Sequence, residues 1–555
     1  MKSSLNIQKK IYLFLIFFIA NTCFGESQEP RLTLIFIVDQ LSQSQMLKLR
    51  SHLKGGIKDM LEDAVVYDNA YFPHTVPATS IGHAALSTGV FAKDHGVVGN
   101  NWYDTLGKKV NFSEDDSSKS AVFDKVGKLS SYGKSGKDIM VQGFSDYFVL
   151  NPKSGSKNYS IAISYKDKAS VAVSGQCGKA IWFDFEKGFF TTSKAYFSTL
   201  PQWLVDFNNS QKIDQLKTVK WDSAYPLKNK AYDFKHISNY EFAGQKRIVG
   251  TKVKVFNSKD KSISYKKFVA TPKANKVLLD LADVCINAFT SNKKNNLLLW
   301  VSFSSLDFIG HDFGPDSLEA IDYIYHLDKQ LKKFIRRLQR RIKKSDIVFV
   351  LTSDHGVDPI PEILQQEGVK SAVRINSLDL VKKMNDLVRK KYGIEKLVIG
   401  FSVPQFFFDN SKFDMLDAEK KDNIFKDLKA FLTNHSGIKT AWTCQELKKS
   451  NFLPTDIESF YKNQLYPGRS GQLIIQVLPH CQVTEYSTGS GHRNPYEYCT
   501  HVPLMIYQKG VLERKIVKER VSTLQFANSM AQVLDIPKPS ASTFDLLPGL
   551  FDYDL

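Results

Sequence analysis

Short, continuous runs of apolar residues alternate along the chain with longer stretches in which apolar positions recur at helical spacing. Runs of the kind found in strands buried on both faces occupy residues 32–38 (LTLIFIV), 296–303 (NLLLWVSF), 347–351 (IVFVL) and 503–507 (PLMIY). Residues 317–344 place Leu and Ile at every third or fourth position, which predicts a long amphipathic helix. Strands that alternate with helices in this way indicate an α/β fold, with a mostly parallel sheet flanked by helices.

Two segments interrupt this alternation. Residues 104–275 are rich in Lys, Ser, Gly and Tyr and contain short alternating stretches, so we expect an insertion with β character. Residues 374–475 combine a helical pattern with short strands and form a second expected insertion. Together the two insertions are expected to form a cap over one α/β core. That core is then divided among residues 26–103, 276–373 and 476–555.

The first helix of the core is expected within residues 46–61, directly after the first strand. Ahead of that strand, residues 1–25 have the pattern of a secretory signal peptide, with three lysines, a short apolar run at 11–20 and a small residue at Gly25. The run has about half the length that a helix needs to cross a bilayer, and no later stretch is a credible membrane span. We therefore expect the mature protein to be periplasmic or secreted.

Of the features of the composition, only the net charge adds to this picture. Of the 555 residues, 43% are hydrophobic and 24% charged, which is typical of a folded globular protein and excludes a disordered, collagen-like or coiled-coil chain. Lys and Arg number 75 against 57 acidic residues, a formal charge of +18. Such an excess favours anionic partners, with general solubility as the alternative. The basic residues are spread along the chain without a nucleic-acid-binding motif, so no specific nucleic acid partner is expected.

Six cysteines are few for this length, and none belongs to a C-x-x-C pair. A structural zinc finger and a thioredoxin-type site are therefore not expected. An exported protein can hold one or two disulfides, but the sequence leaves their pairing open, as it does the oligomeric state.

Acidic and histidine side chains gather just past the carboxyl ends of the expected strands, where ligands bind in open α/β sheets. The six candidates are Asp39, Asp307, His311, Asp354, His355 and His492. Any one such aspartate is more often a helix cap or turn residue. Asp307 and His311, however, are one helical turn apart and can bind one ion. Three Asp and three His would serve two zinc ions with an open position on each, and mixed Asp/His ligation suits zinc better than magnesium.

A candidate nucleophile lies in the segment 73–83 (PHTVPATSIGH), where a loop with two prolines enters a helix. Thr79 or Ser80 is expected at the helix start, where the helix dipole and exposed N–H groups favour an anion. An ordinary N-cap is the alternative. No G-x-S-x-G elbow occurs in the chain, which argues against an α/β-hydrolase.

In their order and spacing these residues resemble the alkaline phosphatase superfamily. The motifs that carry the resemblance are Asp39, Thr79-x-x-Gly-His83, Asp307-x-x-Gly-His311, Asp354-His355-Gly356 and Gly491-His492. The segment 95–103 (HGVVGNNWY) is similar to one branch, the exported phosphate-irrepressible alkaline phosphatases, which look like nucleotide pyrophosphatase/phosphodiesterases in their metal core. The resemblance implies an α/β core with a site for two zinc ions (Zn²⁺).

The resemblance also implies a role for each residue. Thr79 would be the nucleophile that becomes phosphorylated, and Asn100 would donate to a phosphate oxygen. Lys166 and Lys168 would bind the phosphoryl group where this branch uses a Lys-x-Arg pair. One zinc ion would be held by Asp39, Asp354 and His355, and the second by Asp307, His311 and His492.

Two positions depart from the branch. Lys168 stands where the branch has Arg, so the charge is kept but the planar, bidentate fork is lost. Lysines in a Lys-rich insertion are also commonly just solvated. Cys499 stands where the family often has Asp, and we expect this to loosen the support of the His492 loop.

The sequence therefore predicts a zinc-dependent alkaline phosphatase acting on small-molecule phosphate monoesters through a phosphothreonine intermediate. A nucleotide pyrophosphatase/phosphodiesterase on the same core is the nearest alternative, and Lys166 and Lys168 discriminate the two because a monoester dianion rewards two cations. An exported anion-binding protein with an inactive metal site is an alternative of a different class. A sulfatase is disfavoured, because the C/S-x-P-x-R segment that generates its nucleophile is missing from the sequence.

Overall fold

The computed structural model describes residues 30–211, 213, 218–234, 245–254 and 261–551. The expected signal peptide, residues 1–25, lies outside the described residues. Within the described ranges no helix is both long and apolar enough to cross a membrane. The cysteines of this part of the chain are all free thiols: Cys177, Cys285, Cys444, Cys481 and Cys499.

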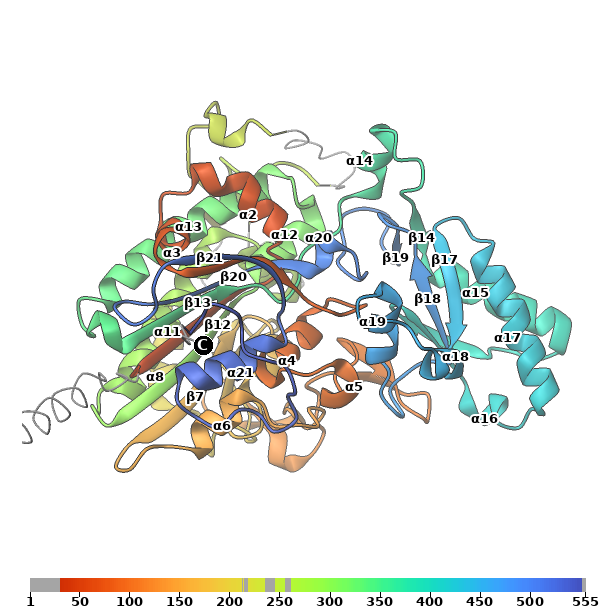
Figure 1. The fold of residues 1–555 in the computed structure, drawn as a ribbon, viewed down its shortest axis with the longest axis horizontal. Coiled ribbons are helices and arrows are strands. Elements are labelled where there is room, and N and C mark those ends of the chain that lie inside the picture. The colour runs from red at the N-terminus through yellow and green to blue at the C-terminus, as the bar shows by residue number, and fades with distance from the viewer. Residues whose placement is uncertain (1–29, 212, 214–217, 235–244, 255–260, 552–555) are drawn as a thin grey trace, which may run out of the picture.

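A nine-stranded sheet forms the centre of the main body (Figure 1). Its strands lie in the order β21 (Lys515–Ser522), β2 (Val65–Tyr71), β20 (His501–Gln508), β13 (Ile347–Thr352), β1 (Leu32–Val38), β12 (Asn295–Phe303), β7 (Lys157–Ser164), β8 (Lys179–Asp184) and β9 (Phe189–Thr191). The strands β7, β12, β1 and β13 are parallel neighbours, whereas β20 runs antiparallel to β13 and β2. The expected α/β fold with a mostly parallel sheet is confirmed.

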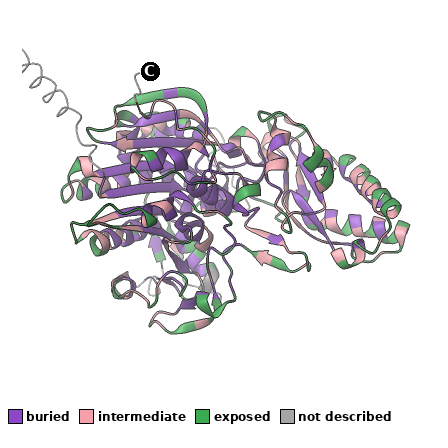
Figure 2. Cartoon of the chain, turned by 60° about the horizontal axis from the view of Figure 1, so that its bottom comes forward, coloured by how far each residue is buried: buried purple, intermediate pink, exposed green. Residues whose placement is uncertain are grey.

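Helices cover both faces of this sheet, which is why its central strands β1, β12 and β13 are buried at almost every position. In β1, Leu34 and Phe36 face a core formed with α3 (Gly56–Asp63), α11 (Pro272–Thr290) and α13 (Leu318–Leu338). The alternate residues of β1 face a second core, formed with α4 (Thr79–Thr88), α6 (Phe144–Leu150) and α21 (Gln525–Val533). The central strands of the main body are accordingly buried almost throughout, whereas the edge strand β21 is largely exposed (Figure 2).

Part of the segment 104–275 belongs to the core sheet, which differs from the insertion expected for it. Strand β7 pairs in parallel with β12 over eight residues and carries β8 and β9 to the edge of the sheet. In residues 160–164 Ile alternates with the small residues Ser and Ala, a pattern typical of an amphipathic strand, yet all five residues are buried. Ser and Ala are small enough to pack under helices, so their alternation does not mark a solvent-exposed face.

The second expected insertion forms a lobe of its own, on the right of Figure 1. Its four-stranded antiparallel sheet has the order β15 (Val398–Ser402), β16 (Gln405–Phe408), β18 (Leu473–Val477) and β17 (Ile438–Thr443). Helices α15 (Ser377–Tyr392) and α17 (Ala418–Thr433) pack on it around a separate hydrophobic core. The strand β18 extends two residues past the predicted boundary at 475.

The helix expected at 46–61 is divided into α2 (Gln43–Leu49) and α3, with a 3₁₀ turn between them. The buried carboxylate of Asp328 on α13 accepts hydrogen bonds from the backbone N–H groups of Lys54, Ile57 and Lys58. Because a carboxylate from another helix caps the start of α3, the chain can stop and restart a helix within one periodic pattern.

Candidate metal and phosphate site

The topology brings all six candidate ligands to one edge of the sheet. Asp39 follows β1, Asp354 follows β13, and Asp307 lies in the first turn of α12 (Ser305–Phe313), directly after β12. Because β20 runs antiparallel to these strands, the loop that precedes it returns to their carboxyl ends and carries His492 there. Ligands that are more than 450 residues apart in the chain therefore meet at one place.

Asp307, His311 and His492 form one compact group, as predicted for one of the two ions. The Nε2 atoms of His311 and His492 lie 3.2 and 3.3 Å from Asp307 Oδ1. The ligand atoms of the group all lie within 4.8 Å of one another, close enough to bind one ion. The Nδ1 atoms of the two rings are hydrogen-bonded to backbone carbonyls, those of Ser490 at 2.8 Å and Pro77 at 2.7 Å. These bonds orient both Nε2 atoms toward the carboxylate.

Asp39, Asp354 and His355 meet beside this group. His355 Nε2 lies 3.4 Å from Asp39 Oδ1 and 3.4 Å from Asp354 Oδ2. Each of these three atoms is buried and makes no well-formed hydrogen bond, although His83 Nδ1 lies 3.2 Å from Asp354 Oδ2. Asp307 borders this group too, because its carboxylate, Asp39 and His355 also offer ligand atoms within 4.8 Å of one another. Buried polar atoms without partners are costly, so the donor set fits a bound cation.

Burial sets the protonation of the site. It lowers the pKa of His355 and lowers that of His492 to about 3, so both imidazoles are neutral near pH 7, as metal ligation requires. Burial and the nearby Asp354 carboxylate raise the pKa of Asp39 well above its usual value. Burial acts in the same direction on Asp307, but Lys166 and His311 outweigh it and hold the pKa of Asp307 well below its usual range.

Lys166 precedes α7 (Asp167–Ser174) and extends into the middle of this cluster. Its Nζ donates hydrogen bonds to Asp39 Oδ2 at 2.6 Å and Asp307 Oδ2 at 2.5 Å. It also donates to Thr79 Oγ1 at 3.3 Å. Burial alone would lower the pKa of Lys166, but the two carboxylates raise it above its usual value. The ammonium is therefore charged and lies beside the candidate nucleophile.

The two hydroxyls at the start of α4 have different environments. The helix begins at Thr79, which is buried and has its Oγ1 beside Lys166. Ser80 Oγ instead donates to the backbone carbonyl of Gly99 at 2.9 Å and lies 2.8 Å from Asn100 Oδ1. Ser80 is thus engaged in holding the 99–100 loop, and the geometry favours Thr79 as the hydroxyl of the site.

The remaining two candidates lie at the starts of two helices: Asn100 is beside the start of α4, and Lys168 is in the first turn of α7. Asn100 Oδ1 accepts a hydrogen bond from Ser80 N at 3.1 Å and lies 2.8 Å from Ser80 Oγ, which fixes the amide and leaves Nδ2 as a donor. Lys168 is half-buried in the first turn of α7, and among the described residues it forms no salt bridge. Burial and the neighbouring Lys166 lower the pKa of Lys168, while Asp167 acts in the opposite direction.

The sequence analysis missed Gln40, which ties the two ligand groups together. Its backbone N–H donates to Asp354 Oδ1 at 3.2 Å and its Nε2 donates to Asp307 Oδ1 at 3.0 Å. Gln40 has a φ of 74°, the left-handed region that a non-glycine residue seldom adopts. The only signal for Gln40 in the sequence was a polar residue directly after a strand. Its left-handed backbone could not be predicted, because φ is determined by the fold.

A second buried network, also missed, supports the His492 loop. Asp358 Oδ1 accepts from Asn494 Nδ2 at 2.7 Å and from Cys499 Sγ at 2.6 Å, and its backbone N–H donates to Gly491 O. Burial raises the pKa of Asp358 to about 6. Cys499 thus takes part in the support of this loop, because its thiol donates to the carboxylate that helps to hold it.

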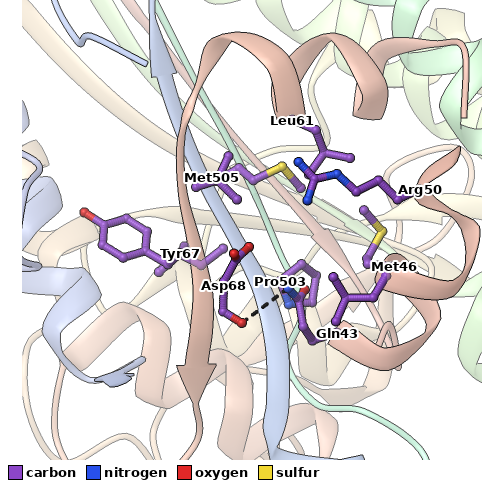
Figure 3. Close-up of a pocket in the computed structure, with 11 residues that line it drawn as sticks. Gln43, Met46, Arg50, Leu61, Tyr67, Asp68, Pro503 and Met505 are labelled. Carbon is purple, nitrogen blue, oxygen red and sulfur yellow. Dashed lines mark hydrogen bonds between the residues drawn. The ribbon is translucent and has the colours of Figure 1, made fainter. Parts of the chain in front are cut away.

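A small pocket between α2, β2 and β20 lies outside this site (Figure 3). It is lined by residues that include Gln43, Met46, Arg50 and Asp68, and by none of the six candidate ligands. Gln43 Nε2 donates to the backbone carbonyl of Asp68 across it. Its lining offers no cluster of metal-ligating or nucleophilic groups.

Residues 33–502 match the type I phosphodiesterase/nucleotide pyrophosphatase family. The chain belongs to this family. It is 28% identical over 535 residues to the alkaline phosphatase PhoV of Synechococcus elongatus, a match that covers 94% of this chain and 93% of PhoV. It is 27% identical over 527 residues to the alkaline phosphatase PafA of Elizabethkingia meningoseptica, covering 92% and 93% of the two chains.

The crystal structure of wild-type alkaline phosphatase PafA has the same fold, with a TM-score of 0.81 at 24% identity over 94% of this chain and 99% of that chain. The family match and these relatives confirm the resemblance to the alkaline phosphatase superfamily that the motifs predict.

Proposed function

We propose that the protein is an exported, zinc-dependent alkaline phosphatase that hydrolyses phosphate monoesters through a phosphothreonine intermediate. The observation that carries the proposal is the buried Thr79 hydroxyl beside Lys166, next to six ligand side chains at one sheet edge. Full-length relatives that are themselves named alkaline phosphatases support the same activity.

The donor set fits two cations, and mixed Asp and His ligands favour zinc. One ion would be held by Asp39, Asp354 and His355, and the other by Asp307, His311 and His492. When bound, two zinc ions supply Lewis acidity, which lowers the pKa of a nearby hydroxyl and neutralises charge on the leaving oxygen.

The chain's own residues perform the transfer in two displacements. Thr79 Oγ1 loses its proton to solvent and attacks phosphorus, and the bond to the ester oxygen breaks as that oxygen leaves with the electron pair and takes up a proton from solvent. Water then attacks phosphorus and gives up a proton, the bond to Thr79 Oγ1 breaks, Thr79 Oγ1 takes up a proton, and inorganic phosphate is released. Lys166, Lys168 and the Nδ2 group of Asn100 bind the equatorial oxygens, and the positive end of the α4 dipole favours the same anion.

A phosphodiesterase on the same core is the second candidate, favoured by the description of the family itself. The two activities place different demands on the site. A monoester presents a doubly charged terminal group with exposed oxygens, which two lysines and an amide can engage. A diester exposes one oxygen fewer and needs space for a second substituent.

The decisive experiment compares p-nitrophenyl phosphate with bis-p-nitrophenyl phosphate, using purified zinc-loaded protein. We expect a higher kcat/KM for the monoester. If Lys168 engages the phosphoryl group, Lys168→Ala lowers monoester turnover far more than diester turnover, because charge-assisted hydrogen bonds are worth roughly 1.5–3 kcal/mol. A preference for the diester, unaffected by this substitution, would favour the phosphodiesterase. Metal binding without turnover of either ester would favour the anion-binding alternative.

Export is proposed from the sequence pattern of residues 1–25. Sequencing the amino terminus of the protein recovered from outside the cytoplasm tests this. We expect the mature chain to begin just after Gly25, and an intact Met1 in an exported fraction would contradict cleavage.

A further inference from the structure

Arg374 lies at the base of the lobe, where the chain leaves the main body. It begins β14 (Arg374–Asn376), which pairs in parallel with β19 (Gln482–Thr484), so that Arg374 and Gln482 are direct neighbours (Figure 1). Only 11% of the Arg374 side chain is exposed. A charged group that is this far removed from water needs partners for its donors, and these partners show what the residue holds in place.

The guanidinium of Arg374 joins three parts of the chain. Its Nε and Nη2 donate to the two carboxylate oxygens of Glu362 on α14 (Pro361–Gln366), each at 2.8 Å. Its Nη1 donates to Gln482 Oε1 at 3.3 Å, and Nη2 also donates to the backbone carbonyl of Gly489 at 2.8 Å. Because the bidentate contact with Glu362 fixes the plane of the guanidinium, it also fixes the donor that is directed at Gly489.

The peptide unit between Gly489 and Ser490 connects this guanidinium to a candidate metal ligand. Its carbonyl accepts from Arg374, and its N–H, which belongs to Ser490, donates to the backbone carbonyl of His311 at 3.1 Å. The following carbonyl, that of Ser490, is hydrogen-bonded to His311 Nδ1 at 2.8 Å. The loop therefore holds both the backbone and the ring of His311, and the bond at Nδ1 leaves Nε2 available to a cation.

The close approach of Gly489 to His311 limits where this loop can lie. Gly489 has a φ of 79°, in the left-handed region, and a Cβ added there would lie 2.2 Å from the backbone oxygen of His311. Hydrogen bonds at the two ends of one peptide unit also polarise each other. A shift of the Gly489 carbonyl is therefore transmitted to His311.

We propose that Arg374 is a positioning residue for His311 and sets the affinity of one of the two metal sites. The His311 site comprises Asp307, His311 and His492, and the His355 site comprises Asp39, Asp354 and His355. The proposal rests on the proposed function, which assigns one zinc ion to each site, and deepens it. Among the described residues, Arg374 forms no hydrogen bond or salt bridge with a member of the His355 site. Its influence is therefore directed to the His311 site.

Zinc titration of the full-length protein after chelation, measured by calorimetry, tests this without turnover. In His355→Ala the His311 site remains. Adding Arg374→Ala should lower its zinc affinity about tenfold, the low end of the loss that is typical when a partner of a metal ligand is removed. In His311→Ala the His355 site remains, and Arg374→Ala should leave its affinity unchanged. A residue needed only for folding would weaken both sites alike.

Two milder variants keep the test decisive if Arg374→Ala fails to fold. Glu362→Gln keeps the guanidinium but loses the charged, bidentate contact that orients it, so the His311 site should weaken by a smaller factor. Arg374→Lys keeps the positive charge, but an ammonium cannot contact Glu362, Gln482 and Gly489 together. This variant should therefore recover only part of the affinity lost in Arg374→Ala.

Arg389→Ala is the matched control, since Arg389 forms an exposed ion pair with Asp386 in the same lobe. It should leave both zinc affinities unchanged. An unchanged His311 site in Arg374→Ala, or an equal loss at both sites, would overturn the positioning role and leave the phosphatase intact if Thr79→Ala still inactivates the enzyme. Selective loss at the His311 site, in a protein that hydrolyses no ester, would support the positioning role and reject the proposed function.

Discussion

At the scale of single residues, the neighbouring hydroxyls Thr79 and Ser80 make the strongest contrast. Thr79→Ala removes the proposed nucleophile, so we expect kcat for a monoester to fall by about 10³-fold or more with zinc content unchanged. Thr79→Ser should keep part of the activity, because a hydroxyl remains. Ser80→Ala loses the bonds to Gly99 and Asn100 and should have the smaller effect. The reverse order of severity would move the nucleophile to Ser80.

The raised pKa of Asp358 predicts that the stability of the protein depends on pH. Its pKa is raised by burial to about 6 from a usual value of 3.8. The folded state therefore binds this proton more tightly than the unfolded state, and the free energy of unfolding falls as pH rises from about 4 to 6. Asp358→Asn keeps an acceptor for Asn494 and Cys499 but cannot ionise. Relative to wild type, we expect the variant to gain stability across this pH range and to keep that gain above it.

Denaturant unfolding at pH 4.5 and pH 7.5 measures this difference. Both proteins are unfolded in the presence of a chelator, so that pH-dependent metal binding does not contribute. A constant difference between variant and wild type at the two pH values would show that Asp358 does not titrate in this range.

At the scale of elements, the position of α4 against the end of β13 decides where Thr79 lies. A Cβ added at Gly82 would lie 2.2 Å from the backbone oxygen of Asp354, so only glycine allows this approach. Gly→Ala in a helix normally stabilises by about 1 kcal/mol. Here we expect Gly82→Ala to destabilise by about 1–3 kcal/mol, as overpacking does, and to lower kcat by displacing Thr79. Increased stability with full activity would show that the contact can relax.

The helices and strands that could be predicted from the sequence are those whose hydrophobic pattern has a single physical cause. Strands β1, β12 and β13 are continuous apolar runs because helices cover both faces, and the predicted bounds agree to within one residue. Strand β7 was assigned to an insertion because buried Ser and Ala imitate an amphipathic strand. The break between α2 and α3 depends on Asp328, almost 270 residues away, which no local pattern can reveal.

The same distinction applies to the site. The six candidate ligands could be predicted to lie together, because the carboxyl ends of parallel strands share one edge of the sheet. Gln40 and Asp358 were not predictable, since one depends on a left-handed backbone and the other on a network closed by Cys499.

At the scale of the whole molecule, the separate lobe and the main body meet beside the site. The hairpin of β3 (Asn101–Tyr103) and β4 (Lys109–Asn111) begins one residue after Asn100 and packs on the lobe, with the rings of Tyr103 and Phe407 5.1 Å apart. Ser402 Oγ also donates to Asn101 O at 2.8 Å. The lobe therefore supports the segment that carries a proposed phosphate ligand, which gives this insertion a role in the site.

Metal content ties the site to the stability of the whole chain. Three buried carboxylates, those of Asp39, Asp307 and Asp354, face one buried ammonium, and three ligand atoms there have no hydrogen bond. Cations that satisfy these atoms bind only the folded state, so they stabilise it by about 2.7 kcal/mol at a free concentration a hundredfold above Kd.

We expect about two zinc ions per chain, and a chelator should abolish activity and lower Tm together. Elemental analysis and calorimetry before and after chelation measure both effects, and zinc, but not magnesium alone, should restore them. Full activity in protein without a bound transition metal would contradict the zinc assignment, whereas recovery of Tm without recovery of turnover would show that the ions bind but that Thr79 is not activated.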